Sequence, residues 1–248
     1  MTMLRTVLFF LSTLFLMNPL HAEQSTAPVS GFARSFIFSS ALSDATITVN
    51  ETGQHFTTND DGHFGPFNYP IGKPITLTLE KWGYKTTQSA TVILTPDGAN
   101  GPYTNITFQV PSIQTFFLLS KMIGATVDDD SCHLTATITQ FHKTMDDIPQ
   151  GIAGAEIVLT PSVNVKPFYF DIITKGPLAN KTYPFSNKLT QTSEDGGVAV
   201  FNLPPRAEPY TLTAKKPGVK FSKVLFLCKK GVFINLSPPQ GPTELIEH

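Results

Sequence analysis

The chain has 248 residues, of which 41% are hydrophobic and 15% are charged. Its 18 Lys and Arg and 19 Asp and Glu give a formal net charge of −1 at pH 7. This balance provides no basic field to hold phosphates, which argues against a nucleic-acid partner. The length suits one large domain or two ordinary ones.

The start of the chain has the order of a secretory signal peptide. Arg5 supplies a positive charge, an apolar run covers residues 6–17, and the small residue Ala22 precedes the expected cleavage point. The run is shorter than the roughly 20 apolar residues of a membrane-spanning helix, and the polar C-terminus shows no anchor signal. We therefore expect residues 1–22 to be removed and the protein to be exported, to a periplasm or to the medium, without a membrane anchor.

After this leader, the same order of short sequence blocks occurs twice. The stretch TNDDGHFGPFNYP at residues 58–70 is similar to TSEDGGVAVFNLP at residues 192–204. Upstream of them, ATITV at residues 45–49 pairs with AEIVL at residues 155–159, and downstream ITLT pairs with YTLT. The repeat distance exceeds the roughly 20–50 residues of solenoid repeats. The sequence therefore predicts two whole domains of one kind.

Alternating segments rich in Thr, Val, Ile and Phe predict half-buried strands in both halves, at a spacing that favours sandwiches. Asp61-Gly62 and Asp195-Gly196 predict tight hairpin turns, because glycine readily adopts positive φ. In the first half, strands are expected near residues 32–38, 45–50, 54–58, 63–68, 74–80, 87–94 and 104–110. In the second half, they are expected near residues 133–140, 155–160, 167–173, 188–192, 198–202, 210–214, 221–228 and 231–236.

One segment between the repeats is a helix candidate. The apolar residues of 112–125 follow helical spacing in part, and Gly124 is placed to end a helix. A strand is equally compatible with such a short apolar run. The acidic stretch at residues 128–132 then marks a hinge into the second half.

These features set the expected domain boundaries. The first sandwich is predicted to cover residues 23–127 and the second residues 128–248. The second differs by an insertion around residues 160–188 that is rich in Phe and Tyr. Because function tends to lie in variable loops, this insertion is predicted to form a protruding hairpin or a binding loop.

The chain has two cysteines, Cys132 and Cys228. An even number in an exported chain predicts a disulfide. It would close a loop of about 97 residues, for which chain entropy predicts a stabilisation on the order of 4–5 kcal/mol. The alternative is two separate buried thiols.

The turn pattern resembles the carboxypeptidase regulatory-like domain, which has a transthyretin-like β-sandwich. The matching residues in the first half are Thr58, Asp61, Gly62, Phe64, Gly83 and Tyr84. Those in the second half are Thr192, Asp195, Gly196, Val198 and Gly218, where Val219 replaces the tyrosine. The resemblance covers residues 32–110 well and residues 133–236 loosely. It implies an all-β protein of two tandem transthyretin-like or immunoglobulin-like sandwiches, with an accessory role in folding or binding, and it favours a bacterial source.

No sequence motif assigns a catalytic residue, a metal site or a cofactor. The chain lacks a Gly-x-Ser-x-Gly elbow, a P-loop and a His-Glu-x-x-His pair. The transthyretin-like hydrolases of purine breakdown end in a Tyr-Arg-Gly-Ser signature that is also missing. The enzymatic alternative is a metal-dependent hydrolase built from His55, His63 and Asp60, since the histidines flank the first Asp-Gly turn. Zinc would require further ligands there.

Aromatic residues are the best indication of a binding site. Trp82 and Tyr84 alternate beside a glycine turn, which would place them on one face, while Phe168 and Tyr169 lie in the insertion. Exposed aromatic rings stack on sugars or anchor protein partners, although Phe is more often a core residue. We therefore expect a non-enzymatic module that binds an extracellular protein or a carbohydrate. A structural subunit whose edge strands pair between chains is the other alternative, and the oligomeric state stays open.

Overall fold

The computed structural model describes residues 25–96, 103–172, 182–186 and 188–246. The expected signal peptide lies outside these residues, as does part of the insertion. Within them, no helix has the length and apolar character needed to cross a membrane.

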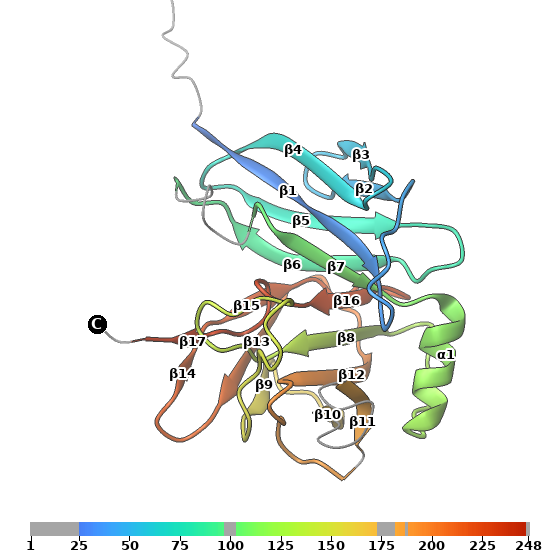
Figure 1. Ribbon diagram of the computed structural model, residues 1–248, viewed down its shortest axis with the longest axis vertical. Coiled ribbons are helices and arrows are strands. Elements are labelled where there is room, and N and C mark those ends of the chain that lie inside the picture. The colour runs from blue at the N-terminus through green and yellow to red at the C-terminus, as the bar shows by residue number, and fades with distance from the viewer. Residues whose placement is uncertain (1–24, 97–102, 173–181, 187, 247–248) are drawn as a thin grey trace, which may run out of the picture.

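Strands dominate the regular secondary structure of the described chain, and α1 (Ile113–Met122) is its single helix (Figure 1). The first half contains β1 (Thr26–Ser35), β2 (Thr46–Val49), β3 (His55–Thr57), β4 (His63–Pro70), β5 (Pro74–Glu80), β6 (Thr87–Ile93) and β7 (Ile106–Val110). The second contains β8 (Cys132–Thr137), β9 (Glu156–Thr160), β10 (Pro167–Ile172), β11 (Thr182–Ser186), β12 (Gly197–Leu203), β13 (Tyr210–Lys215), β14 (Lys220–Phe221), β15 (Val224–Phe226), β16 (Phe233–Leu236) and β17 (Glu244–Leu245). The predicted all-β class is confirmed.

In the first half, two sheets enclose one core. The strand order is β4-β1-β7 in one sheet and β3-β2-β5-β6 in the other. The alternation seen in the sequence places Ile47 and Leu77 on the inner face of the second sheet, and Phe64 and Phe108 face them from the first. All four side chains are fully buried. Each contributes roughly 1.5–3 kcal/mol through removal of apolar surface from water.

The second half repeats this pairing pattern. β1 pairs antiparallel with β4 and parallel with β7, and β8 pairs antiparallel with β12 and parallel with β16. Likewise, the antiparallel order β2-β5-β6 recurs as β9-β13-β15. The duplicated sequence blocks therefore occupy corresponding places in two sets of strands with the same connectivity.

A buried threonine fixes the same corner in both halves. The hydroxyl of Thr58 accepts a hydrogen bond from the Ala45 amide at 2.9 Å, and Thr192 accepts one from the Ala155 amide at the same distance. The threonine amide in turn donates to the alanine carbonyl in each half, at 3.0 and 2.9 Å. Because the bonds and the sequence positions correspond, the threonines before the two Asp-Gly turns have the same role: each holds the residue that precedes β2 or β9.

The glycines of the two turns are also equivalent. Gly62 and Gly196 both have φ of 75°. A Cβ on either would lie 2.4 Å from a backbone oxygen, that of Ala33 or of Ile138, so no other residue fits without displacement. The sequence predicted that both turns close hairpins, and this prediction is wrong. The strand before each turn, β3 or β11, does not pair with the strand after it, β4 or β12, and the first turn carries the chain from one sheet to the other.

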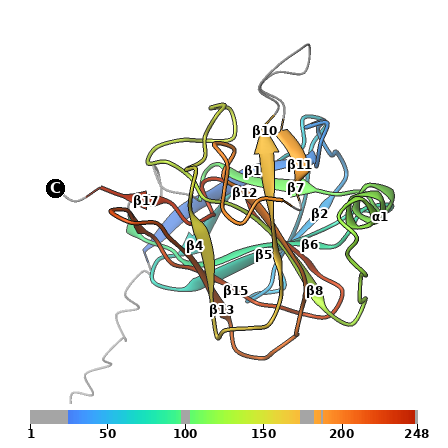
Figure 2. The ribbon, with the colours of Figure 1, turned by 90° about the horizontal axis from the view of Figure 1, so that it is seen from below.

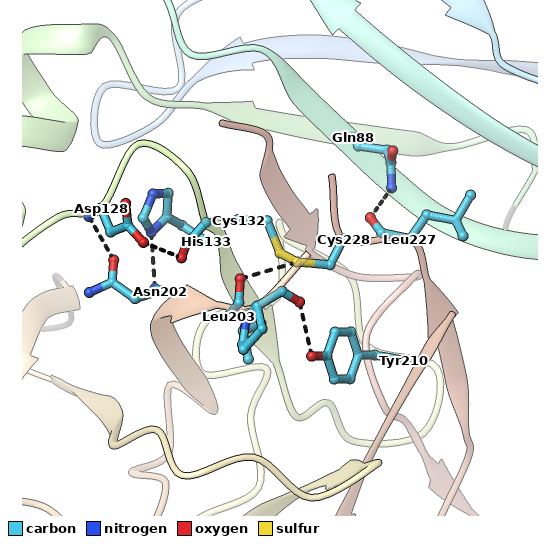
Figure 3. The surroundings of a disulfide bond; sticks show 11 residues. Gln88, Asp128, Cys132, His133, Asn202, Leu203, Tyr210, Leu227 and Cys228 are labelled. Carbon is cyan, nitrogen blue, oxygen red and sulfur yellow. Dashed lines mark hydrogen bonds between the residues drawn. A yellow bond between two sulfur atoms is a disulfide. The ribbon is translucent and has the colours of Figure 1, made fainter. Parts of the chain in front are cut away.

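The two halves are joined through β6. This strand pairs with β5 in its own half and with both β15 and β16 in the other, which produces one sheet of 12 strands. Gln88 of β6 also donates its side-chain amide to the Leu227 carbonyl at 2.8 Å (Figure 3). The second half is thus closed by a strand that the first half supplies, an arrangement visible where the two halves meet in Figure 1.

The helix candidate is a helix, and it packs on the second half. Ser112 caps its N-terminus by accepting from the Thr115 amide at 3.0 Å, and Gly124 follows its end with φ of 69°. Phe116 and Leu119 pack in a cluster formed mainly by aromatic residues of β10, β12 and β16. The domain boundary after residue 127 remains a prediction, but the buried face of α1 lies against the second half.

The predicted disulfide is confirmed. Cys132 at the start of β8 bonds to Cys228 beyond β15, at a sequence separation of 96 (Figure 3). Both cysteines are buried in the core of the second half. The cross-link therefore constrains only the second half of the molecule.

Three strand predictions need correction. β1 begins at Thr26 and ends at Ser35, because Ile37 and Ser39 adopt positive φ in a turn. Residues 188–192 are not a strand, since they form turns and bends. The single strand expected near residues 221–228 is two short strands, β14 and β15. The strand expected near residues 167–173 is confirmed as β10, which together with β11 extends the sheet beside β12.

Candidate binding surface

Trp82 is the most exposed large apolar side chain of the described residues. It lies in the turn between β5 and β6, is 96% exposed, and is the only tryptophan of the chain. Gly83, with φ of 83°, allows the turn, which a bond from the Tyr84 amide to the Lys81 carbonyl closes at 3.1 Å. The turn thus holds the indole ring in water, where the ring adds no apolar burial to the folded state.

The same turn lies against the first turn of α1. The Ile113 amide donates to the Gly83 carbonyl at 3.0 Å, and the Lys85 amide donates to the Pro111 carbonyl at the same distance. These bonds fix the start of the helix beside Trp82. Segments about 30 residues apart in sequence therefore lie side by side.

The outer side of α1 is apolar as well. Its buried side carries Phe116 and Leu119, yet large apolar side chains on the outer side are more than half exposed. These are Ile113, Phe117, Leu118 and Met122, at 55%, 56%, 60% and 57% exposure. The exposed face of an ordinary surface helix is polar, so four large apolar side chains on this face are unusual. We call these four residues together with Trp82 the Trp82–α1 surface.

Lysines accompany this surface. The Lys121 ammonium lies 5.3 Å from the centre of the Phe117 ring, and the Lys85 ammonium lies 5.0 Å from the centre of the Phe116 ring. The helix itself contains no acidic residue. The Trp82–α1 surface is therefore apolar with a positive fringe, where the cations are held over aromatic rings.

Tyr84 does not share the exposed face of Trp82. Its side chain is half-buried and packs against the core of the first half. Strand alternation predicted a common face, but the turn at Gly83 interrupts that alternation.

The two aromatic residues of the insertion are structural. Tyr169 is 2% exposed, and its hydroxyl accepts from the Ile157 amide at 3.2 Å. Burial raises the pKa of Tyr169. Phe168 is half-buried and lies edge-on to Phe201, with ring centres 6.1 Å apart. Core packing, the alternative noted for Phe168, describes both residues, so neither belongs to the Trp82–α1 surface.

The histidines proposed for a metal site are separated by the sheets. His55 on β3 bonds through Nδ1 to the Thr48 hydroxyl at 2.9 Å, whereas His63 on β4 packs edge-on to Phe32. They do not face each other across a hairpin, because β3 pairs with β2 and β4 pairs with β1. Among the described residues, no group of three or more His, Cys, Asp and Glu is placed to hold a metal ion.

His133 is a feature that the sequence did not indicate. It is 1% exposed, its Nδ1 accepts from the Asn202 amide at 3.3 Å, and its Nε2 has no hydrogen-bond partner in the described part of the chain (Figure 3). Burial, helped by the nearby Lys85, lowers its pKa from 6.5 to about 4. The ring is therefore neutral at pH 7 and lies between Phe116 and Phe201.

The geometry defines an all-β protein of two joined sandwich halves with an exposed apolar surface. No family model and no curated protein matches the sequence. Among solved structures, the Bacillus anthracis TIE protein is 15% identical over 88% of this chain, with a TM-score of 0.25, and this chain spans 34% of it. The shaft pilin SpaA from Lactobacillus rhamnosus GG is 13% identical, with 90% of this chain and 99% of that one covered and a TM-score of 0.25. The major pilin from Streptococcus pyogenes is 16% identical, with 90% and 97% covered and a TM-score of 0.18. Likenesses at these scores carry no argument about this chain.

Proposed function

We propose that the protein is an exported, non-enzymatic binding module that recognises another protein through the Trp82–α1 surface. The observation that carries this proposal is the outer face of α1. Four large apolar side chains remain exposed there beside a tryptophan that is 96% exposed. Contiguous apolar patches on soluble proteins mark interaction sites, and tryptophan is enriched among residues that dominate binding energy.

A protein partner suits this surface better than a glycan. Sugar-binding sites combine an aromatic platform with convergent polar groups that orient the hydroxyls. The outward side chains around Trp82 are mainly aliphatic and aromatic, and Lys121 is directed over the Phe117 ring. Such a surface offers area for burial and few hydrogen bonds, as the centre of a protein interface does.

Export and tandem duplication are the remaining parts of the proposal. The disulfide between Cys132 and Cys228 supports an oxidising compartment, either a periplasm or the extracellular medium. The equal strand pairing and the equivalent Thr58 and Thr192 bonds support two tandem copies of one transthyretin-like sandwich. In that arrangement the scaffold is rigid and the turn at Trp82 presents the contact.

The first experiment compares variants of the exposed residues. Trp82→Ala and Phe117→Ser should fold as wild type, because substitutions of exposed residues usually change stability by about 0.5 kcal/mol or less. Ile148→Ser, at an exposed residue elsewhere, is the matched control. In affinity capture from the source organism, a specific partner should be retained by wild type and by Ile148→Ser and lost with both surface variants.

The second experiment uses the single tryptophan. Titration of the purified partner into the mature protein should shift Trp82 emission to shorter wavelength as the indole leaves water. Unchanged emission at saturation would contradict the proposed site. Stoichiometric zinc in the purified protein that is lost in His63→Ala would contradict the non-enzymatic assignment.

A further inference from the structure

The two halves differ at one sheet edge. In the first half, the outer edge of β2 pairs with β3. β9 is the counterpart of β2, since each begins next to the alanine held by the buried threonine. Among the described residues, however, no strand pairs with the outer edge of β9, which ends its sheet. The described part of the second half therefore contains no counterpart of β3.

The uncovered edge leaves apolar residues partly open. Ile47 and Val49 of β2 are fully buried, whereas Ile157 and Leu159 of β9 are only half-buried. Their backbone amides point outward, because the Ile157 amide reaches the Tyr169 hydroxyl away from β13. The Leu159 amide lies on the same edge two residues later, where strand geometry repeats the direction. In the first half the corresponding amide, that of Val49, donates to the Gln54 carbonyl at 2.9 Å.

A groove of about 270 Å³ runs beside this edge. Its lining is mainly aliphatic and consists of Ile157, Val158, Leu159, Ser162, Val163, Val165, Pro167 and Val200. In the first half the corresponding space holds Phe56 of β3, whose ring stacks on Phe67 at 4.1 Å. Val200 is the counterpart of Phe67 in the second half. Phe67 pairs with Val29 of β1, and Val200 pairs with Leu134, which occupies the place of Val29 on β8. The groove thus lies beside Val200, at the place where Phe56 covers Phe67 in the first half.

The insertion explains why the edge is open. In the first half Thr58 follows Ala45 by 13 positions, and in the second Thr192 follows Ala155 by 37 positions. The added residues form β10 and β11, which extend the opposite sheet next to β12. The chain then returns to Thr192 through residues 188–191 without forming a strand.

We propose that the outer edge of β9 accepts an extended strand from another polypeptide, by β-strand addition. The incoming strand runs antiparallel to β9, as β3 does to β2, replaces the Tyr169 hydroxyl as the acceptor of the Ile157 amide, and places an aromatic side chain opposite Ile157 and over Val200. Main-chain bonds to the edge provide affinity and the groove provides side-chain specificity. The partner segment therefore has the chemistry of β3, with polar residues on both sides of one large apolar residue. This site is distinct from the Trp82–α1 surface, since β9 and α1 lie apart in both views (Figures 1 and 2).

A synthetic peptide of residues 53–59 tests this site, because it contains the strand that the fold itself uses in the first half. Labelled at its end, it should bind the mature full-length protein in an anisotropy titration. The same peptide with Phe56→Ala should bind at least about tenfold more weakly, because the buried ring is lost. Protein with Ser162→Trp should lose binding because the indole occupies the groove, and Ser162→Ala is its matched control.

Amide hydrogen exchange identifies the contact. The Leu159 amide should exchange rapidly in the free protein and become protected when the peptide is bound. Trp82→Ala should bind the peptide as wild type does, so a failure of the Trp82–α1 proposal is distinguishable from a failure here. Absence of binding at millimolar peptide, or equal binding to Ser162→Trp, would overturn the proposal. Protection of Leu159 in the free monomer would mean that the chain covers this edge itself, and protection that appears only with self-association would assign it to a second copy.

Discussion

The two halves of the molecule have the same strand connectivity but differ in how each is completed. The first half covers the edge of β2 with β3 and fills the space beside it with Phe56. The second half directs its extra residues to the opposite sheet and receives β6 from the first half between β15 and β16. The comparison shows that one pairing scheme tolerates large changes at its edges, and that these edges are where the second half depends on other segments.

The largest expected effect concerns the dependence of the second half on β6. A fragment of residues 128–248 lacks β6, so β15 and β16 lose their shared neighbour and a row of backbone groups is left unpaired. We expect this fragment to lose cooperative thermal unfolding as measured by circular dichroism. A fragment of residues 25–111 keeps the two sheets of the first half and should retain it. A cooperative transition of the 128–248 fragment at the melting temperature of the intact protein would contradict the dependence.

The next largest effect is a loss of stability in the second half alone when the disulfide is removed. Replacing Cys132 and Cys228 together by alanine removes a cross-link over 96 residues, and about 4–5 kcal/mol of unfolding free energy is expected to be lost. Hydrogen exchange should accelerate in β8, β12 and β16, while β1 and β2 keep most of their protection. Uniform acceleration across both halves would show that they unfold as one unit.

The buried threonines test whether the halves are equivalent. Thr58→Val and Thr192→Val keep the side-chain shape but remove the acceptor of the Ala45 or the Ala155 amide. Leaving that buried amide unpaired should cost about 1–3 kcal/mol in either variant. Chemical denaturation of the two proteins measures both losses. A large loss in one and none in the other would weaken the duplication argument.

A smaller effect is the pH dependence that His133 gives to the second half. Its pKa is about 4 in the folded protein and 6.5 as the ordinary value, so between these values the unfolded chain binds a proton that the folded protein does not. The contribution of neutral His133 to the free energy of unfolding is therefore complete above pH 6.5 and is lost as the pH falls. The loss is about 2 kcal/mol between pH 8 and pH 5. Denaturant unfolding at the two pH values should show a smaller difference in His133→Phe than in wild type. His142→Phe is the control, and an unchanged difference in His133→Phe would rule out this source.

Local features of the fold were predictable from the sequence. Gly62 and Gly196 indicate turns because positive φ is costly for other residues. The Cys132–Cys228 disulfide was predictable because the exported chain has two cysteines. The helix after Ser112 was one of two equal alternatives, because its short apolar run was also compatible with a strand. Trp82 was correctly singled out as a surface residue, since it stands in a turn.

Features that depend on distant contacts were not predictable. The burial of Tyr169 arises from its contact with Ile157 across the sandwich, and no local pattern distinguishes it from an exposed aromatic residue. The exposed apolar face of α1 was not predictable, because distant residues of β10, β12 and β16 decide which of its apolar side chains are buried. The pairing of β6 with β15 and β16 was not predictable, because the sequence of a strand does not determine which strands lie beside it.

Two backbone amides of the wild-type protein test the central comparison most directly. Native-state hydrogen exchange resolved at single residues should show the Val49 amide strongly protected, because it donates to Gln54 across the β2–β3 edge. The Leu159 amide, at the same place on β9, should exchange near the rate of an unstructured peptide. Equal protection of the two amides would contradict the account, because both edges would then be covered.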